Sequence, residues 1–235
     1  MATRAKRDAS SPVRAFITLE GIDGCGKSTQ ARLLVAALER AGYDVVALRE
    51  PGGTEISEKI RALLLDPANA AMGDTCELLL YEASRAQLVH EVVQPALAAG
   101  RTVVCDRFYD STTAYQGFAD GLDREMVERA NDIAANGCTP DLTLVYDVDP
   151  DRVAARMAER DPDRIEAKGS AYQRKVVEGF RAVAADDPAR VKLVPAAEDI
   201  AHVFVRTIME VNKLGFAISK ADAEDAFVGV VSEGR

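Results

Sequence analysis

Residues 21–28 read G-I-D-G-C-G-K-S, a glycine-rich loop followed by a lysine and a hydroxyl side chain. Glycines allow successive backbone N–H groups to point at one anion, and the helix expected after the loop adds its positive end. The lysine can reach terminal phosphates, and the serine can ligate Mg²⁺. This spacing predicts an ATP-type phosphate site with Lys27 as a catalytic cation. Its binding set comprises Gly21, Ile22, Asp23, Gly24, Cys25, Gly26, Lys27, Ser28 and Thr29.

A strand-end carboxylate is expected to complete this site. Asp106 follows the apolar run 102–105, and Asp147 ends a second run of the same form. A carboxylate in such a position can hold Mg²⁺ or its water shell, so the form alone does not choose between them. Asp106 is favoured because Arg107 follows it, and a phosphate-binding arginine beside a metal carboxylate makes chemical sense. We therefore predict a Mg²⁺ site formed by Ser28 and Asp106.

A series of arginines spaced by four is a further candidate for phosphate chemistry. Its members are Arg152, Arg156, Arg160 and Arg164. On a helix the first three share one face. The Asp-Pro pair at 161–162 then ends the helix and begins a polar loop that could close over a substrate. Acidic neighbours make a solvated charged face the simpler interpretation, and the spacing alone favours it.

The elements that must position these residues follow from apolar periodicity. Short β-rich runs alternate with longer helical patterns, which is typical of a parallel sheet covered by helices. The predicted strands are residues 15–19, 44–48, 102–105, 142–146 and 191–194. The predicted helices are residues 27–41, 54–65, 74–98, 124–135, 150–159, 170–185 and 198–213. Gly42, Gly100 and Gly137 are expected as left-handed caps after three of them.

Charge and composition limit the possible partners. The 235 residues carry a net charge of −9, so binding nucleic acid or an anionic membrane through the overall field is excluded. Residues 1–14 carry +3 of that charge, and the remaining residues carry −12. No apolar stretch approaches the roughly 20 residues that cross a bilayer. Four widely spaced cysteines and two histidines argue against structural zinc and favour free thiols in a reducing cytoplasm.

The chain is expected to form one domain at residues 14–213. Residues 1–13 are interpreted as a disordered basic tail, and residues 214–235 as a C-terminal extension of unknown structure. No internal repeat or composition shift divides the domain.

Six segments, in order and at appropriate spacing, resemble bacterial thymidylate kinases over residues 14–213. They are E-G-I-D-G-C-G-K-S-T-Q at 20–30, R-E-P-G-G-T at 49–54, Y-E-A-S-R-A-Q at 81–87, D-R-F-Y-D-S-T-T-A-Y-Q-G at 106–117, P-D-L-T-L at 140–144 and D-R-I-E at 163–166. The resemblance implies transfer of the γ-phosphoryl of ATP to dTMP with Mg²⁺, giving dTDP and ADP for dTTP biosynthesis. It also implies the three-layer α/β/α fold of P-loop kinases, a five-stranded parallel sheet and a homodimer.

The resemblance assigns roles to individual residues. Asp23 would bind the sugar 3′-hydroxyl, Tyr81 would stack on thymine and Arg85 would bond a base carbonyl. Thr112 and Gln116 lie where thymine N3 is recognised. The full acceptor set is Asp23, Arg49, Pro51, Tyr81, Arg85, Arg107, Thr112, Tyr115 and Gln116. Within it Arg107 would bridge both substrates' phosphates, Tyr115 would exclude ribonucleotides, and a cis Glu50-Pro51 peptide would shape the phosphate site.

The catalytic arginine of this family lies either in the phosphate loop or in the lid. Gly24 and Cys25 occupy the loop positions here, so the chain resembles the lid type, with Arg156 and Arg160 as candidates in a lid near residues 156–169. The chemistry agrees, because an ionised phosphate acceptor needs no general base but does need cations around two polyanions. The need for these cations favours a lid over a solvated face.

Two other functions stay open at this stage. A kinase acting on another nucleotide or on a deoxynucleoside is one, and a nucleoside acceptor would need a carboxylate base, for which Glu20 is the motif-adjacent candidate. A nucleotide-dependent switch is the other. The spacing of Tyr81 and Arg85 suits base recognition, but it also suits a core tyrosine with the arginine stacked over it.

Overall fold

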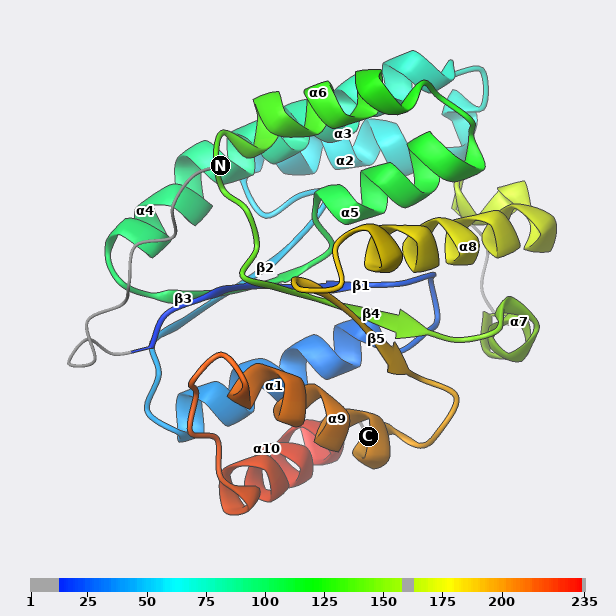
Figure 1. The fold of residues 1–235 in the computed structure, drawn as a ribbon. Helices are drawn as coiled ribbons and strands as arrows, with labels where there is room; N and C mark the ends of the chain where they lie inside the picture. The colour runs from blue at the N-terminus through cyan, green and yellow to red at the C-terminus, as the bar shows by residue number, and fades with distance from the viewer. Residues whose placement is uncertain (1–12, 158–162, 234–235) are drawn as a thin grey trace.

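The sheet has five parallel strands in the order β2-β3-β1-β4-β5. The computed structural model describes residues 13–157 and 163–233. The strands are β1 Phe16–Glu20, β2 Val45–Arg49, β3 Thr102–Asp106, β4 Leu142–Asp147 and β5 Val191–Pro195. β1 lies in the centre of the sheet, so the loop that follows it emerges between two paired neighbours (Figure 1). The predicted parallel sheet is confirmed.

Every strand ends one residue later than the apolar pattern predicts. The additional residue is polar or proline, yet its backbone still joins the ladder, as in the pairing of Arg49 with Asp106 and of Glu20 with Val145. Parallel strands place their carboxyl ends at one edge, where ligands bind in open α/β sheets. The strand extensions therefore set these polar side chains side by side.

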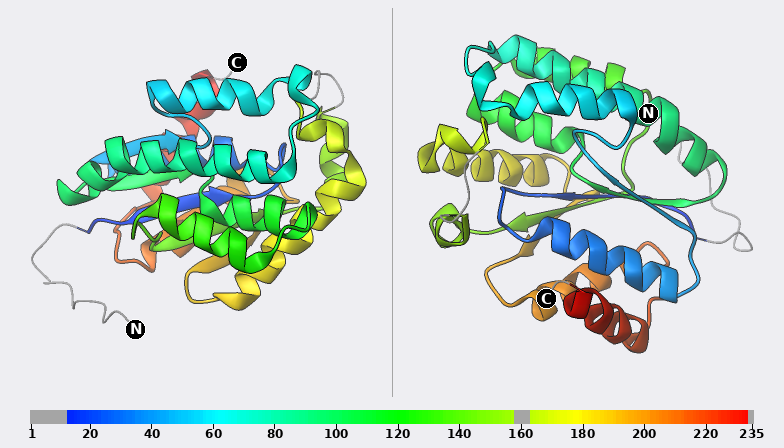
Figure 2. Two further views of the ribbon diagram at one scale, coloured as in Figure 1. Left: turned by 90° about the horizontal axis from the view of Figure 1, so that it is seen from above. Right: turned by 180° about the vertical axis from the view of Figure 1, so that it is seen from behind.

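Helices cover both faces of the sheet, which confirms three layers. α1 (Lys27–Arg40), α9 (Ile200–Asn212) and α10 (Lys220–Glu233) lie on one face. The other face carries α2 (Glu55–Leu65), α3 (Asp74–Leu88), α4 (Gln94–Ala98), α5 (Tyr109–Thr112), α6 (Arg124–Ala135) and α8 (Ser170–Asp186) (Figures 1 and 2). α7 (Pro150–Met157) follows β4 at the carboxyl edge. None of the described helices is long and apolar enough to cross a membrane.

Two helical regions differ from the prediction. Residues 74–98 form a continuous helix, but Val89–Val93 make a wider π-type turn between α3 and α4. Pro95 follows this turn, and in an ordinary α-helix its ring would crowd the carbonyl of Glu91, four residues earlier. Residues 109–119 are also helical, with α5 running into the π-type segment Thr113–Ala119.

The three glycines predicted as left-handed caps after helices, Gly42, Gly100 and Gly137, are confirmed, with φ angles of 79° to 86°.

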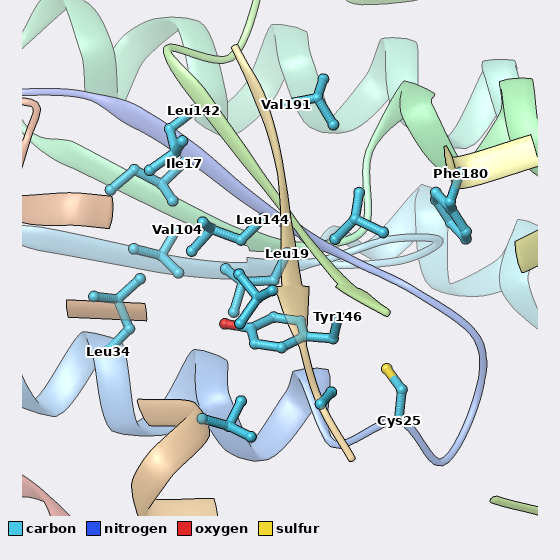
Figure 3. Close-up of a cluster of buried hydrophobic side chains, with 14 of the residues drawn as sticks. Ile17, Leu19, Cys25, Leu34, Val104, Leu142, Leu144, Tyr146, Phe180 and Val191 are labelled. Carbon is cyan, nitrogen blue, oxygen red and sulfur yellow. The ribbon is translucent and has the colours of Figure 1, made fainter. Parts of the chain in front are cut away.

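The principal core lies between the sheet and the helices. Ile17, Leu19, Leu144 and Tyr146 of the central strands are almost fully buried, and Leu34 of α1 packs below them (Figure 3). The hydroxyl of Tyr146 satisfies its polarity by bonding Thr207 at 2.9 Å. Strands buried on both faces need apolar residues at successive positions, which accounts for their continuous apolar runs.

The segment after α9 is ordered against the core. Phe216 and Ile218 are nearly fully buried, and the Phe216 ring contacts Tyr43 with centroids 4.8 Å apart. Ser219 and Asp222 then form a reciprocal capping box that starts α10. Ala226 is fully buried where α10 lies along α1 (Figure 2). The S-x-x-D pattern of residues 219–222 was the sequence signal for this helix.

Gly179 sets how closely α8 approaches the segment Thr113–Ala119. A Cβ at Gly179 would lie 2.8 Å from the Phe118 Cβ and 3.0 Å from the backbone of Ala114. We expect G179A to destabilise the protein by about 1–3 kcal/mol, although alanine favours helix, because overpacking against backbone outweighs propensity. Urea denaturation measures the change in unfolding free energy.

Gly117 offers a matched control within the same packed region. A Cβ there would meet only Val127 at 3.9 Å, which is ordinary contact. We expect G117A to be neutral or stabilising by up to about 1 kcal/mol. Equal effects of the two substitutions would contradict the close-packing argument.

Candidate functional site

The loop between β1 and α1 has the backbone shape that the glycine pattern predicts. Gly21 has a φ of 133°, and a Cβ on it would lie 2.9 Å from the carbonyl oxygen of Tyr146. Gly26 has a φ of 99° and is the N-cap of α1. Close contact excludes a side chain at Gly21, and the positive φ disfavours one at Gly26, where a Cβ would meet nothing within 4 Å. The first N–H groups of α1 remain available to an anion.

Asp23 lies between two cations of the site. Its Oδ1 accepts from Lys27 Nζ at 3.0 Å and from Arg107 Nη2 at 2.7 Å. Burial alone would raise the pKa of Asp23, but the charges of Arg107 and Lys27 outweigh it and hold the pKa well below its usual range. Asp23 therefore stays a carboxylate that can accept a further hydrogen bond.

Arg107 joins the phosphate loop to the helical segment after β3. Its Nη1 donates to Gly21 O at 2.9 Å and to Ser111 Oγ at 3.0 Å. Its guanidinium lies over the Tyr115 ring, 5.2 Å from the centroid. The backbone of Arg107 is left-handed, with a φ of 74°, which is uncommon for a residue with a side chain and is concentrated at functional sites.

One cavity, here named the acceptor cavity, brings together every residue predicted to bind the acceptor. Asp23, Arg49, Pro51, Tyr81, Arg85, Arg107, Thr112, Tyr115 and Gln116 all line it. Lys27, Ser28 and Asp106 line the same cavity, so the phosphate-loop cation and the predicted metal ligands face the same space. Of the other residues in the predicted ATP-binding set, Cys25, Gly26 and Thr29 line a different cavity, and Gly21, Ile22 and Gly24 line neither of the two.

Arg85 lines this cavity and is held in a buried cluster. Its Nε bonds Glu50 at 2.8 Å, and its Nη1 bonds Thr112 at 3.0 Å as well as Glu82. Its guanidinium lies over Phe108, so the alternative in which it stacks over Tyr81 is not what the structure shows. Burial, with Glu82 nearby, raises the pKa of Glu50 to about 7 despite Arg85.

Gln116 is oriented by a neighbour that the sequence did not reveal. Its Nε2 donates to Glu77 Oε1 at 2.7 Å. Glu77 is also bonded by Arg164 at 2.6 Å, and Lys168 lies 3.5 Å away. A carboxylate paired with two cations only accepts hydrogen bonds, so the Gln116 NH₂ must face it. The Gln116 oxygen is then the end available to a ligand.

Arg61 is a cavity residue that motif analysis missed. Its Nη1 bonds the carbonyl of Pro51 at 2.9 Å, and Arg49 bonds the same carbonyl at 3.1 Å. Burial and the charge of Arg49 lower the pKa of Arg61. The Glu50-Pro51 peptide is cis. Arg61 lies on α2, the helix that follows the R-E-P-G-G-T segment. A basic residue on the helix directly after this motif is the sequence feature that could have indicated its place in the cavity.

The predicted metal ligands lie in contact. Ser28 Oγ donates to Asp106 Oδ2, and Asp106 Oδ1 is buried without a hydrogen-bond partner among the described residues. A hydroxyl beside a carboxylate with an unsatisfied oxygen fits Mg²⁺, whose remaining ligands are commonly water and phosphate oxygens. Asp147, the other candidate, is paired with Arg181 and does not line this cavity.

Comparison with known proteins matches this arrangement to one family. The family model for thymidylate kinase matches residues 19–206. The chain belongs to the thymidylate kinase family. A thymidylate kinase of Desulforapulum autotrophicum is 44% identical over 206 residues, which cover 84% of this chain and 91% of that protein. One of Geobacter sulfurreducens is 46% identical over 192 residues, covering 79% and 90%.

A solved structure agrees with the sequence relatives. The crystal structure of the thymidylate kinase from Ehrlichia chaffeensis matches with a TM-score of 0.71 and 33% identity, covering 86% of this chain and 99% of that one. Thymidylate kinases phosphorylate dTMP to dTDP in dTTP synthesis, so the family is one of nucleoside monophosphate kinases. The resemblance stated from the motifs is confirmed.

The lid predicted for this family member is described in part. Arg156 lies in α7, and Arg160 falls outside the described residues. Arg164 is buried, with its Nε bonded to Leu64 O at 2.7 Å and its Nη1 bonded to Glu77. Of the arginine series, Arg164 therefore anchors the end of the lid segment to α2 and α3.

Glu20 is a structural carboxyl rather than a base facing the acceptor. It is fully buried, accepts from Phe108 N at 2.7 Å and bonds the Ser111 hydroxyl. It does not line the acceptor cavity. The deoxynucleoside kinase alternative, which required Glu20 as the base, thereby loses its candidate residue.

Glu20 provides a pH test of this arrangement. Burial, followed by the charge of Asp110, raises the pKa of Glu20 from 4.5 to about 8. The folded state then holds a proton that the unfolded state releases, so this stabilisation is complete below about pH 4.5 and is lost as the pH rises through about 8. We expect wild-type stability to fall over this range by up to about 1.4 kcal/mol per pH unit from this group.

We expect E20Q to lose the part of the pH dependence of the unfolding free energy that Glu20 contributes, and to keep turnover with dTMP. The exposed substitution E224Q should keep the wild-type pH dependence. Urea unfolding at a series of pH values measures the three proteins. An unchanged slope in E20Q would show that Glu20 is not the titrating group.

Proposed function

We propose that this chain transfers the γ-phosphoryl group of ATP to dTMP, releasing dTDP and ADP, with the residues of the acceptor cavity in the roles given below. The observation that carries the proposal is the convergence of all predicted acceptor residues with Lys27, Ser28 and Asp106 on one cavity. These residues come from four separate segments of the chain. Only the fold brings them together.

Thymine recognition follows from the fixed polar groups. The Gln116 oxygen accepts the N3–H of thymine, because Glu77 occupies its amide NH₂. Thr112, whose oxygen accepts from Arg85, lines the same cavity. Arg85 bonds a base carbonyl, and its charge is secured by Glu50 and Glu82. Tyr81 stacks on the base, which a half-buried ring lining the cavity allows.

The sugar and acceptor phosphate occupy the rest of the cavity. Asp23 accepts the 3′-hydroxyl, and Tyr115 excludes a 2′-hydroxyl by crowding. Arg49 and Arg61, held at the Pro51 carbonyl, bind the acceptor phosphate. Arginine forks match phosphate oxygens better than a point charge does. These contacts orient the acceptor oxygen toward the phosphate loop.

The chemical step depends on positioning and electrostatics. The acceptor phosphate is already ionised near neutral pH, so no side chain has to remove a proton from it. Lys27 and Arg107 stabilise the charge that spreads over the transferred group. Arg156 or Arg160, carried by a lid near residues 156–169, completes this set when the lid closes. The catalytic unit in this proposal spans residues 14–213.

Mg²⁺ belongs to the same proposal, held by Ser28 and by Asp106 or its water shell. When bound, it neutralises charge on the donor phosphates. Ser28 lies in the first turn of α1 and Asp106 ends β3, so two rigid elements set their separation.

The proposal also includes a homodimer and a cytoplasmic location. A homodimer is supported by exposed apolar side chains on two adjacent helices, Leu79 of α3 and Ile133 of α6. A cytoplasmic location is supported by the four cysteines, which are all unpaired and so suit a reducing compartment.

An acceptor panel tests the function. A coupled assay of ADP release should show turnover with dTMP and little with AMP, GMP or CMP, because Gln116 and Arg85 are placed for the N3–H and a carbonyl of thymine, which these three bases do not present in the same arrangement. Slow ATP hydrolysis that no acceptor accelerates would instead support the nucleotide-dependent switch. Equal turnover with AMP would contradict thymidylate specificity.

Substitutions at Asp106 and Asp147 provide a test of the Mg²⁺ site and its matched control. D106N is expected to raise the Mg²⁺ concentration needed for half-maximal rate by about 10- to 100-fold, because the metal's water shell loses a charged partner. D147N removes a carboxylate paired with Arg181 and should leave that concentration unchanged. Initial rates against free Mg²⁺, at saturating substrates, measure both. If only D147N raised this Mg²⁺ concentration, the metal site would lie at the end of β4 instead.

A further inference from the structure

A second cavity lies against the opposite side of the phosphate loop. It encloses about 550 Å³ and is lined by Gly26 and Thr29 of the loop and α1, by Ala196 and Asp199 between β5 and α9, and by Phe227 of α10. Lys27 and Ser28, the next residues of the loop, line the acceptor cavity instead. The loop therefore separates two cavities at the carboxyl edge of the sheet.

The position of this cavity indicates that it receives the nucleoside of the donor. Phosphoryl transfer brings the attacking and leaving oxygens roughly into line, so donor and acceptor approach the transferred group from opposite sides. With the acceptor in the first cavity, the nucleoside of the donor must leave the loop on the side of the second. Ala196, Val203 and Phe227 give this cavity apolar walls that suit a flat neutral base. Glu198 and Asp199 disfavour a further phosphate there.

Phe227 comes from a part of the chain that the family model does not cover, since the match ends at residue 206. It is nevertheless held firmly. Ala226 beside it is fully buried, and Gly229 lets Arg40 of α1 approach α10 closely. The capping box at Ser219 and Asp222 fixes the start of the helix. A half-buried aromatic ring is thus presented to the cavity from a docked helix.

We propose that α10 forms one wall of the donor-nucleotide site and that Phe227 packs against the base of ATP. The proposal rests on the function proposed above for the identity of the donor. It assigns the C-terminal helix a role in donor affinity that is separate from acceptor recognition, because Phe227 lies across the phosphate loop from the acceptor cavity.

The test compares full-length variants at one position. Loss of base stacking in F227A is expected to raise the KM for ATP by about ten-fold while the KM for dTMP stays within two-fold. F227Y keeps an aromatic ring and should restore the wild-type KM, and F227L should lie between. V228A, at an exposed position on the same helix, should match the wild type.

Ligand binding separates contact with the base from a general effect on the loop. Calorimetry should show weaker ADP binding to F227A and unchanged binding of inorganic tripolyphosphate, which has no base. Equal weakening of both ligands, or a KM for ATP within two-fold of the wild type, would overturn the proposal. ADP binding needs no turnover, so the role of Phe227 is testable even if dTMP proves not to be the acceptor. Absence of dTMP-dependent turnover in the wild type would instead count against the proposed function.

Discussion

The contacts of Arg107 hold the functional end of this molecule together. Its guanidinium binds the phosphate loop at Gly21 and Asp23, and it also binds Ser111 and covers Tyr115 on the segment after β3. A left-handed backbone at a residue with a side chain costs on the order of 1–3 kcal/mol, and it persists because several contacts determine it. Through this residue, the phosphate loop and the helical segment after β3 are fixed relative to each other.

Acidic residues in the site serve to place cations. Asp23 lies between Lys27 and Arg107, while Glu50 and Glu82 flank the buried Arg85. A buried cation without a partner is strongly destabilising, so each needs a carboxylate before any phosphate arrives. This explains how a chain of net charge −9 can bind two phosphorylated substrates. The local arrangement of charges matters here, and the total does not.

The central position of β1 determines how the two cavities are divided. Its loop emerges between β3 and β4, with the acceptor residues on the α2 and α3 side of the sheet and α1, α9 and α10 on the other. α10 adds a layer outside the region shared with the family. It packs on α1, and its Phe227 lines the cavity beside the phosphate loop that Gly26 and Thr29 also line.

The sequence by itself determined the five strands, most helices and the phosphate loop, and its motifs predicted a set of residues that the fold brings to one cavity, because local periodicity and contiguous motifs encode them. It did not reveal Arg61, the link from Glu77 to Gln116, or the buried role of Glu20. Those depend on contacts between residues up to about ninety positions apart, which carry no local pattern. Only the tertiary structure distinguishes Asp106 from Asp147, because Asp106 lines the cavity that Lys27 and Ser28 also line, whereas Asp147 is paired with Arg181 and does not line that cavity.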